Sequence, residues 1–160
     1  MRPGLSLGAL KARFRDEKAE LEAIRRHVAA TDVACDIGAN KGSFTFWLAR
    51  WCRRGRVIAF EPQAEIAGRL ASDCRSLNFS NVTVEAIGVY SKSGVQKLSV
   101  PRAHFPGASI CSAGTTGESA SVPVRVVPLD DYFAAGEKIS LLKIDVEGAE
   151  LHVFKGAGAF

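Results

Sequence analysis

The sequence predicts an α/β fold with a doubly wound parallel sheet, and three observations support this prediction. Short apolar segments alternate with helical segments along the first half of the chain. The connections between these segments are short, as in sheets whose strands run parallel. A glycine-containing loop at residues 38–42 follows the first apolar segment and opens a helix. With 160 residues, of which 47% are hydrophobic and 24% charged, the chain has the size and composition of one globular domain.

The first half of the chain supplies regular helix–strand alternation. Residues 8–29 form an amphipathic pattern with one apolar stripe, so we expect an N-terminal helix within residues 1–30 that packs on the rest of the domain. Thr31 and Asp32 end this helix. The elements expected next are a strand at 33–37, a helix at 43–53, a strand at 56–60, a helix at 63–77 and a strand at 82–87.

The pattern changes after Gly88, where a β-rich insertion over residues 89–127 begins. Turn residues at 91–94 predict a β-hairpin between 89–90 and 95–100. Residues 101–120 are rich in Ser, Gly, Pro and Thr and predict a loop, and 122–127 is typical of an edge strand. The elements expected last are a short helix at 129–135, a buried parallel strand at 141–145 and a helix at 148–155, so that residues 31–160 form one domain.

Composition and charge exclude several classes of protein. No apolar run approaches the roughly 20 residues of a membrane-spanning helix, and residues 5–10 are too short for a signal-peptide core, so we expect a cytoplasmic protein without a membrane partner. The net charge is +4, but residues 1–56 hold 12 of the 21 Lys and Arg and only 6 of the 17 acidic residues, a local net of +6. No aromatic-and-basic interleaving of the kind that stacks bases accompanies these residues, so we expect a solvated basic face and no nucleic-acid partner.

The cysteines carry no signal of a metal or redox site. The four residues form no CxxC pair and no cluster with the three histidines. We therefore expect reduced, structural thiols and no metal centre, because a zinc site needs more closely spaced ligands.

The loop after the first strand carries the first functional signal, in the segment DIGANKG at 36–42. Backbone N–H groups in such a loop can face a ligand. A Walker loop is excluded because Lys41 precedes Gly42, and the dinucleotide fingerprint is broken because Asn40 stands where it needs a glycine. Asp36, if it is not a strand-end or capping carboxylate, would repel a phosphate and attract an ammonium or sulfonium. S-adenosylmethionine fits this pattern better than NAD.

Further acids follow two other predicted strands. Glu61 ends the second strand, 25 positions after Asp36, where a carboxylate can accept both hydroxyls of an adenosine ribose. Asp145 ends the strand at 141–145 and could bind the cationic end of a cofactor or orient an acceptor, with Glu147 at the rim of the same crevice. Lys143 is a lone cation in a buried strand, so we expect it to pair with a nearby carboxylate rather than to act in catalysis.

Five segments together resemble the FkbM-type methyltransferases: DIGANKGSF (36–44), AFEP (59–62), NVTVEAIG (81–88), PLDDY (128–132) and LLKIDVEGAELHVFKGA (141–157). The KIDVEGAE portion is the most distinctive, and the resemblance covers about residues 30–157. Members of this family are class I, S-adenosylmethionine-dependent enzymes that mostly methylate hydroxyl oxygens on sugars and natural products. The resemblance therefore implies the Rossmann-like doubly wound sheet of class I methyltransferases and a small-molecule acceptor.

The resemblance also implies roles for individual residues. The methionine end of the cofactor would lie against Asp36, Gly38, Ala39, Asn40 and Gly42. Glu61 would hold the ribose, and Ala86 and Ile87 would flank the adenine. Asp145 would lie close to the reactive methyl group, and the insertion would cover the site. A hydroxyl acceptor must lose its proton, and the candidate bases are His104 in the insertion, Asp145 and Glu147.

Two function classes stay open: an O-methyltransferase, and a non-catalytic cofactor-binding module that kept the sheet but lost turnover. A nicotinamide oxidoreductase is a third and less favoured class, because Asn40 and Asp36 argue against it.

The sheet of class I methyltransferases has the order 3-2-1-4-5-7-6, of which this sequence supplies strands 1 to 4, so we expect a C-terminally truncated sheet of order 3-2-1-4. Strand 141–145 would then be an edge. We expect either a fragment of a longer domain or a homodimer through that edge, and better binding than turnover of S-adenosylmethionine.

Overall fold

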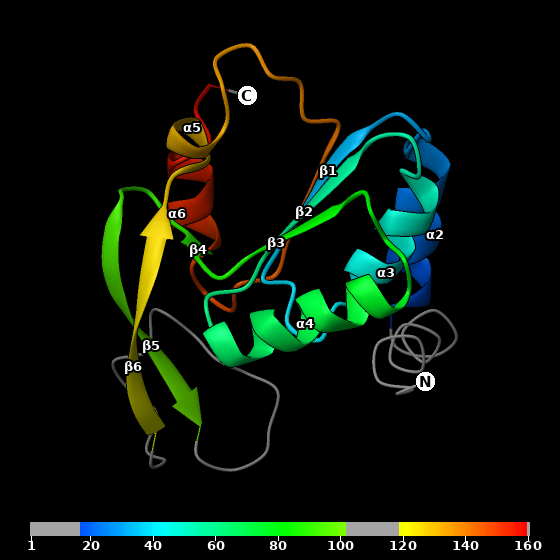
Figure 1. Cartoon of the computed structure of the whole chain (residues 1–160). Coiled ribbons are helices and arrows are strands. Elements are labelled where there is room, and N and C mark those ends of the chain that lie inside the picture. Colours follow the sequence, from blue (N-terminus) through cyan, green and yellow to red (C-terminus); the bar gives the residue numbers. More distant parts are fainter. Residues whose placement is uncertain (1–16, 102–118, 160) are drawn as a thin grey trace.

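The computed structural model describes residues 17–101 and 119–159, and two sheets organise this part of the chain (Figure 1). The larger sheet has four parallel strands in the order β3-β2-β1-β7. These strands are β1 (Val33–Ile37), β2 (Arg56–Phe60), β3 (Val82–Glu85) and β7 (Leu141–Ile144). Because β7 is the fourth strand of this sheet along the chain, the observed order confirms the predicted order 3-2-1-4 and the α/β fold class.

Helices cover both faces of the larger sheet (Figure 1). On one side lie α2 (Lys18–His27), α3 (Ser43–Trp51) and α4 (Ala64–Ser76), and on the other lie α5 (Leu129–Tyr132) and α6 (Glu150–Lys155). Side chains alternate along each strand, so β1 and β2 must be apolar on both faces. Cys35 and Phe60 pack in the cluster that contains Leu129 of α5 and Val153 of α6.

The opposite face of the same strands packs against α3 and α4. Ala34 and Val57 lie in one cluster with Leu48 of α3, and Ala59 lies in another with Leu70 of α4. Leu21 of α2 is fully buried and packs with Phe44 of α3. The predicted helix at 8–29 is therefore present over Lys18–His27, and its first part lies outside the described residues.

The three described cysteines, Cys35, Cys52 and Cys74, are buried free thiols. Burial raises the pKa of the Cys35 thiol to about 12 and that of Cys74 to about 11, so both stay protonated at neutral pH. Cys111 lies outside the described residues. Within residues 17–101 and 119–159, no group of three or more His, Cys, Asp or Glu side chains is placed to hold a metal ion.

The insertion forms the smaller sheet, with the strand order β4-β6-β5. Its strands are β4 (Gly88–Val89), β5 (Gly94–Pro101) and β6 (Ser119–Val127). The predicted hairpin between 89–90 and 95–100 is wrong, because β4 pairs in parallel with the end of β6 and β5 pairs antiparallel with β6 along its whole length. The pairing of β5 with β6 buries Leu98, Val124 and Val126 together in one cluster. The predicted partner of β5, a strand of only two residues, is too short to cover this cluster.

The edge position predicted for residues 122–127 is wrong as well, since β6 is the central strand of its sheet. Proline fits there because β4 reaches only Val126 and Val127, so that β6 has a described neighbour on one side at Pro123. The predicted strand at 82–87 ends at Glu85. Ile87 packs against the core instead, which explains why this segment looked like a longer strand. Most of the loop predicted at 101–120 lies outside the described residues.

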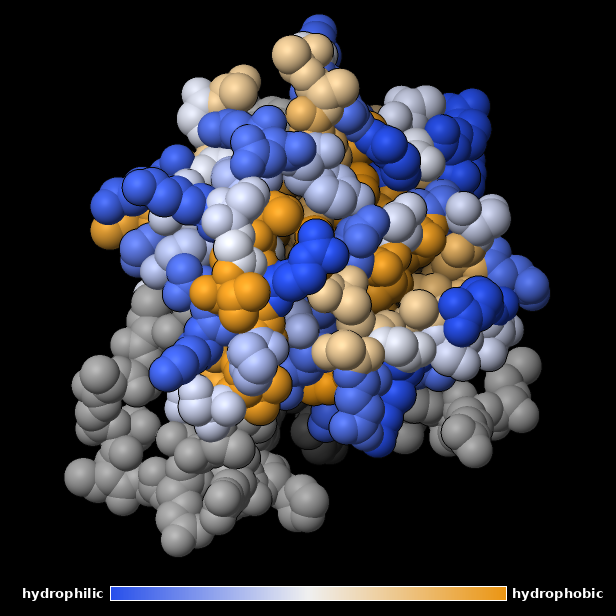
Figure 2. Space-filling model, turned by 60° about the vertical axis from the view of Figure 1, so that its left-hand side comes forward, coloured by the Kyte–Doolittle hydropathy of each residue, from blue (hydrophilic) through white to orange (hydrophobic). Residues whose placement is uncertain are grey.

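Apolar surface is dispersed rather than concentrated. The large apolar side chains that are most exposed are Val95 on β5, Val122 on β6, and Leu151 and Phe154 on α6. Figure 2 shows one face of the molecule, on which separate apolar areas alternate with hydrophilic side chains. None of the described helices has the length and apolar character needed to cross a membrane.

Candidate functional site

A cleft lies where the carboxyl ends of β1, β2 and β7 meet the insertion. Such ends line one crevice in an open parallel sheet, which is where ligands bind in this architecture. The main sheet and its loops contribute Ile37, Gly38, Asn40, Phe60, Glu61, Pro62, Gln63, Asp145, Val146 and Glu147. The insertion contributes Gly88, Val89 and Leu98. The cleft thus has an apolar wall on the side of the insertion and three carboxylates on the other sides.

The loop after β1 has a tightly folded backbone. Gly38, Asn40 and Gly42 all have positive φ angles, of 79°, 47° and 81°. A side chain at Gly38 is excluded, because a Cβ atom there would lie 1.9 Å from the carbonyl oxygen of Asp145. Gly38 therefore allows the loop to pack directly against the chain that leaves β7.

Four of the five amides of this loop donate hydrogen bonds within the protein, contrary to the prediction that they can face a ligand. The amides of Gly38 and Ala39 both donate to the carbonyl oxygen of Phe60, at 3.0 Å each. The amide of Gly42 donates to the carbonyl oxygen of Ala39 at 2.7 Å, and that of Asn40 donates to Glu61. The end of β2 thus holds the loop in place. A ligand could contact these four residues only through atoms other than their amide N–H groups.

Glu61 is the acceptor that organises this part of the cleft. Its side chain is buried, with Oε2 accepting a hydrogen bond from the amide of Asn40 and Oε1 accepting one from the amide of Gln63, both at 2.9 Å. Burial raises the pKa of the Glu61 carboxyl, while the hydrogen bonds from Gln63 and Asn40 oppose this shift. Each carboxylate oxygen keeps a second lone pair. Glu61 can therefore support the loop and still accept hydrogen bonds from a ligand.

Asp36 is not among the residues that line the cleft, contrary to the expectation that its carboxylate attracts a cationic ligand there. Its side chain is fully buried on the α3 side of β1, because side chains alternate along the strand and Ile37 takes the cleft side. The hydroxyl of Thr45 donates a hydrogen bond of 2.6 Å to Oδ2. Nζ of Lys143 lies 3.2 Å from Oδ1, which confirms the prediction that Lys143 pairs with a carboxylate.

Asp145 and Glu147 both line the cleft after the end of β7. The amide of Asp145 donates to the carbonyl oxygen of Ile37 at 2.9 Å, and its side chain is 65% exposed. Glu147 has a positive φ of 47°, and Gly148 follows with a φ of 101°. Burial, together with the charges of Asp145 and Glu150, raises the pKa of the Glu147 carboxyl. A raised carboxyl pKa makes Glu147 a better proton acceptor near neutral pH than an ordinary glutamate.

The structure brings five of the predicted site residues together around the cleft, namely Gly38, Asn40, Glu61, Asp145 and Glu147. Ala39 packs instead in the apolar cluster that contains Leu70 of α4, and Gly42 caps the N-terminus of α3. Ala86 and Ile87 are not among the lining residues, and the next two residues along the chain, Gly88 and Val89, take their place. His104 lies outside the described residues.

Sequence reasoning missed the contribution of β5 to the cleft. Leu98 lines the cleft although it is ten positions beyond Gly88 in the chain. The sequence did indicate that some residue of the insertion lines the cleft, because the insertion was predicted to cover the site. The identity of the residue depends on the pairing of β5 with β6, which local patterns do not encode.

Comparisons with known proteins show the family of the chain. The sequence profile of the methyltransferase FkbM domain matches residues 36–160. The chain is 30% identical to methyltransferase sdnD of Sordaria araneosa, over 76% of this chain and 58% of that protein. It is 28% identical to the hexuronic acid methyltransferase AglP of Haloferax volcanii, over 90% of this chain and 59% of that protein. The chain thus spans somewhat more than half the length of these relatives.

A solved structure shares the fold. The methyltransferase FkbM from Methylobacillus flagellatus KT superimposes with a TM-score of 0.56 at 22% sequence identity, over 81% of this chain and 30% of that chain. At this level of identity the likeness concerns the fold alone. It agrees with the strand order of the larger sheet.

Proposed function

The chain belongs to the methyltransferase FkbM family, and from this premise we propose that its cleft binds S-adenosylmethionine for methyl transfer to a hydroxyl group of a sugar or small natural product. One observation carries the proposal. Glu61, Asp145 and Glu147 meet in one cleft at the carboxyl ends of parallel strands, beside a loop held in a fixed conformation. Such a site is suited to a nucleoside that carries a positive charge.

The residues present fit S-adenosylmethionine better than a nicotinamide dinucleotide. The lining residues include three carboxylates and, within the described ranges, no Lys, Arg or His. A pyrophosphate would be repelled in such a cleft, whereas a sulfonium and an ammonium would be attracted. Glu61 keeps lone pairs that can accept from ribose hydroxyls, and Val89 offers an apolar surface to a base.

The mechanism assigns separate tasks to the residues of the cleft. S-adenosylmethionine, when bound, supplies a methyl group that its sulfonium has already activated. Glu61 holds the ribose, and the loop at 38–42 fixes the shape of the cleft beside it. Correct positioning of the two reactants then contributes most of the rate enhancement. Asp145 and Glu147 lie where an acceptor hydroxyl would approach, and one of them takes its proton. His104 stays a third candidate for this base.

The insertion is proposed to form the acceptor side of the site. Gly88 and Val89 of β4 and Leu98 of β5 line the cleft, so the smaller sheet forms one of its walls, and Leu98 is the part of this wall that we assign to the acceptor. Among the relatives, AglP is named for its action on a hexuronic acid, which supports a sugar as acceptor for this chain as well.

Two measurements test this proposal. Calorimetry of the chain with S-adenosylmethionine, S-adenosylhomocysteine and NAD should show binding of both adenosyl ligands and none of NAD. Binding of NAD alone would contradict the proposed cofactor. A methylation assay with a panel of sugars and uronic acids then addresses turnover. If both adenosyl ligands bind and no acceptor is methylated, the chain is a cofactor-binding module, which is the alternative function.

A further inference from the structure

Lys143 occupies a position that no role in the proposed mechanism explains. It is the direct register partner of Asp36 across the parallel pair of β1 and β7. The lysine side chain is only 13% exposed, and the aspartate side chain has no exposed surface. Register therefore dictates an ion pair inside the sheet, with Nζ 3.2 Å from Oδ1 of Asp36.

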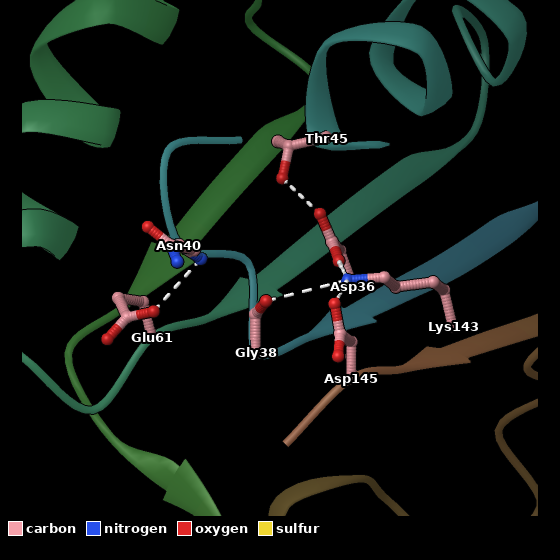
Figure 3. A network of polar contacts seen from close by, with 7 residues as sticks. All are labelled: Asp36, Gly38, Asn40, Thr45, Glu61, Lys143 and Asp145. Carbon is pink, nitrogen blue, oxygen red and sulfur yellow. Dashed lines mark hydrogen bonds and ion pairs between the residues drawn. The ribbon is translucent and has the colours of Figure 1, made fainter. Parts of the chain in front are cut away.

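The ammonium group of Lys143 lies at the centre of a wider set of contacts (Figure 3). Besides Asp36, it is 3.5 Å from the carbonyl oxygen of Gly38 and 3.7 Å from Oδ2 of Asp145. The ring of Phe44 on α3 lies 4.7 Å from Nζ, on a side where a cation is attracted to the aromatic face. A lysine has three N–H donors, and three acceptors surround this one.

The charges of this group do not cancel, since two carboxylates share one ammonium. Asp36 is the nearer of the two carboxylates to Lys143, and it is fully buried. Its Oδ1 accepts no well-aligned hydrogen bond, so the ion pair with Lys143 is what offsets the cost of burying this charge. A buried carboxylate without a counter-charge is costly, whereas Asp145 is exposed to water. Lys143 therefore neutralises Asp36, and the remaining negative charge belongs to Asp145.

The same contacts join the two walls of the cleft. Gly38 and Asp145 both line it, and they touch each other, since no Cβ atom fits between Gly38 and the Asp145 carbonyl. Lys143 contacts both residues from behind, through the Gly38 carbonyl oxygen and the Asp145 carboxylate. Without this contact, the 65% exposed side chain of Asp145 would be free to turn into solvent.

We propose that Lys143 is a positioning residue of the cleft. It holds the Gly38 carbonyl and the Asp145 carboxylate in a fixed relation and makes Asp145, not Asp36, the carboxylate available at the cleft. The ligand-binding part of this proposal rests on the proposed function, namely that the cleft binds S-adenosylmethionine. The competing explanation is that Lys143 serves only as the counter-ion of Asp36.

Removal of the buried pair as a whole distinguishes these explanations. Lys143→Met alone leaves Asp36 without a counter-charge and should fold poorly. The double variant Asp36→Asn/Lys143→Met removes both charges and restores neutrality inside the sheet. If Lys143 positions the cleft, the folded double variant should bind S-adenosylmethionine and S-adenosylhomocysteine about tenfold more weakly than the wild type, a loss of the size expected for charge-assisted contacts. Wild-type affinity in the double variant would overturn the proposal.

A matched control uses a lysine outside this group. Lys138→Met changes an exposed residue in the connection before β7 and should leave both affinities unchanged. A circular dichroism melt of each variant establishes that the protein compared is folded.

A second measurement uses chains that keep Lys143 and decides the matter if the double variant does not fold. In protein labelled with ¹⁵N-lysine, the Asp145→Asn substitution should shift the ammonium resonance of Lys143 in the absence of any ligand, because the two groups are in contact. Addition of S-adenosylmethionine to the wild type should shift the same resonance. A resonance that Asp145→Asn leaves in place would overturn the positioning role. If the wild type binds neither adenosyl ligand, the proposed function fails, while the Asp145→Asn comparison still tests Lys143.

Discussion

The backbone amide of Asn40 donates a hydrogen bond of 2.9 Å to Oε2 of Glu61, and this bond joins the loop after β1 to the end of β2. The other carboxylate oxygen accepts from the amide of Gln63, the residue that precedes α4. Glu61 is therefore a structural support of two loops as well as a lining residue of the cleft. A substitution at this position acts on both properties.

We predict that Glu61→Ala weakens the binding of S-adenosylmethionine by tenfold or more and also lowers the free energy of unfolding. The binding loss follows from the missing ribose acceptor, and the stability loss, of about 1–3 kcal/mol, from two amides left without their acceptor. Calorimetry and urea denaturation measure the two effects. Glu65→Ala, at an exposed position on α4, is the matched control and should change neither. An unchanged dissociation constant in Glu61→Ala would rule out the ribose role.

The raised pKa of Glu61 predicts a particular dependence of stability on pH. Burial raises this pKa above its ordinary value of 4.5, so the folded protein binds more protons than the unfolded chain between that value and the raised one. Stability from this group is therefore complete below pH 4.5 and is lost as the pH rises through the raised pKa. Urea denaturation over a pH series should show the wild type losing stability relative to Glu61→Gln across this window. A difference that stays constant with pH would contradict the assignment.

The contact of Gly38 with Asp145 predicts that Gly38→Ala is severely destabilising. The new methyl group would lie 1.9 Å from a backbone oxygen, and the φ of 79° is unfavourable for alanine. We expect a loss of about 3 kcal/mol or more, or a failure to fold. Gly68→Ala in α4 is the control, since a Cβ atom there meets nothing within 4 Å. It should stabilise the helix by up to about 1 kcal/mol. Equal melting temperatures of the two variants would show that the described loop geometry is wrong.

Asp145→Asn should reduce turnover more than cofactor affinity. The amide keeps the size of the side chain but cannot take a proton, so we expect kcat to fall by about a hundredfold if Asp145 is the base. The affinity for S-adenosylhomocysteine should change far less. Single-turnover kinetics and calorimetry separate the two effects. If only affinity falls, Asp145 is a binding residue, and the proton acceptor is Glu147 or His104.

The outer edge of β7 predicts self-association. Within the described ranges β7 pairs only with β1, so one row of its backbone N–H and C=O groups has no strand beside it. An unpaired strand edge is a template for pairing with a second chain. Of the two outcomes expected for this edge, a fragment of a longer domain or a homodimer through residues 141–145, we predict the homodimer for this chain. Light scattering over a range of protein concentrations should show a mass that rises toward twice 17.1 kDa. A constant monomer mass would contradict this prediction.

The parts of the fold that sequence predicted well are those set by short-range patterns. The bounds of β1 and β2 follow directly from apolar runs between polar residues, and both strands agree with the prediction at each end. The pairing of Lys143 with a carboxylate was predictable as well, since a cation inside a strand needs a counter-charge. The resemblance to a known family added the strand order.

The incorrect predictions concern long-range partners. Whether the amide of Asn40 can face a ligand depends on where Glu61 lies after β2, and the pairing of β5 depends on β6, which is separated from β5 by the 17 residues 102–118. The direction of the Asp36 side chain depends on which face of β1 holds Ile37 against the cleft. Each of these is decided by the packing of segments that are distant in sequence, so local residue patterns could not reveal it.

The two ends of the insertion lie next to each other, because Gly88 and Val89 are the register partners of Val126 and Val127. The chain leaves the main domain and returns to it at neighbouring points. A segment with adjacent ends can be replaced without displacing the scaffold that carries it. Exchange of residues 94–125 for the corresponding segment of a relative should therefore leave β1, β2 and β7 in place, and we expect it to change the acceptor preference through the part of the cleft that Leu98 lines.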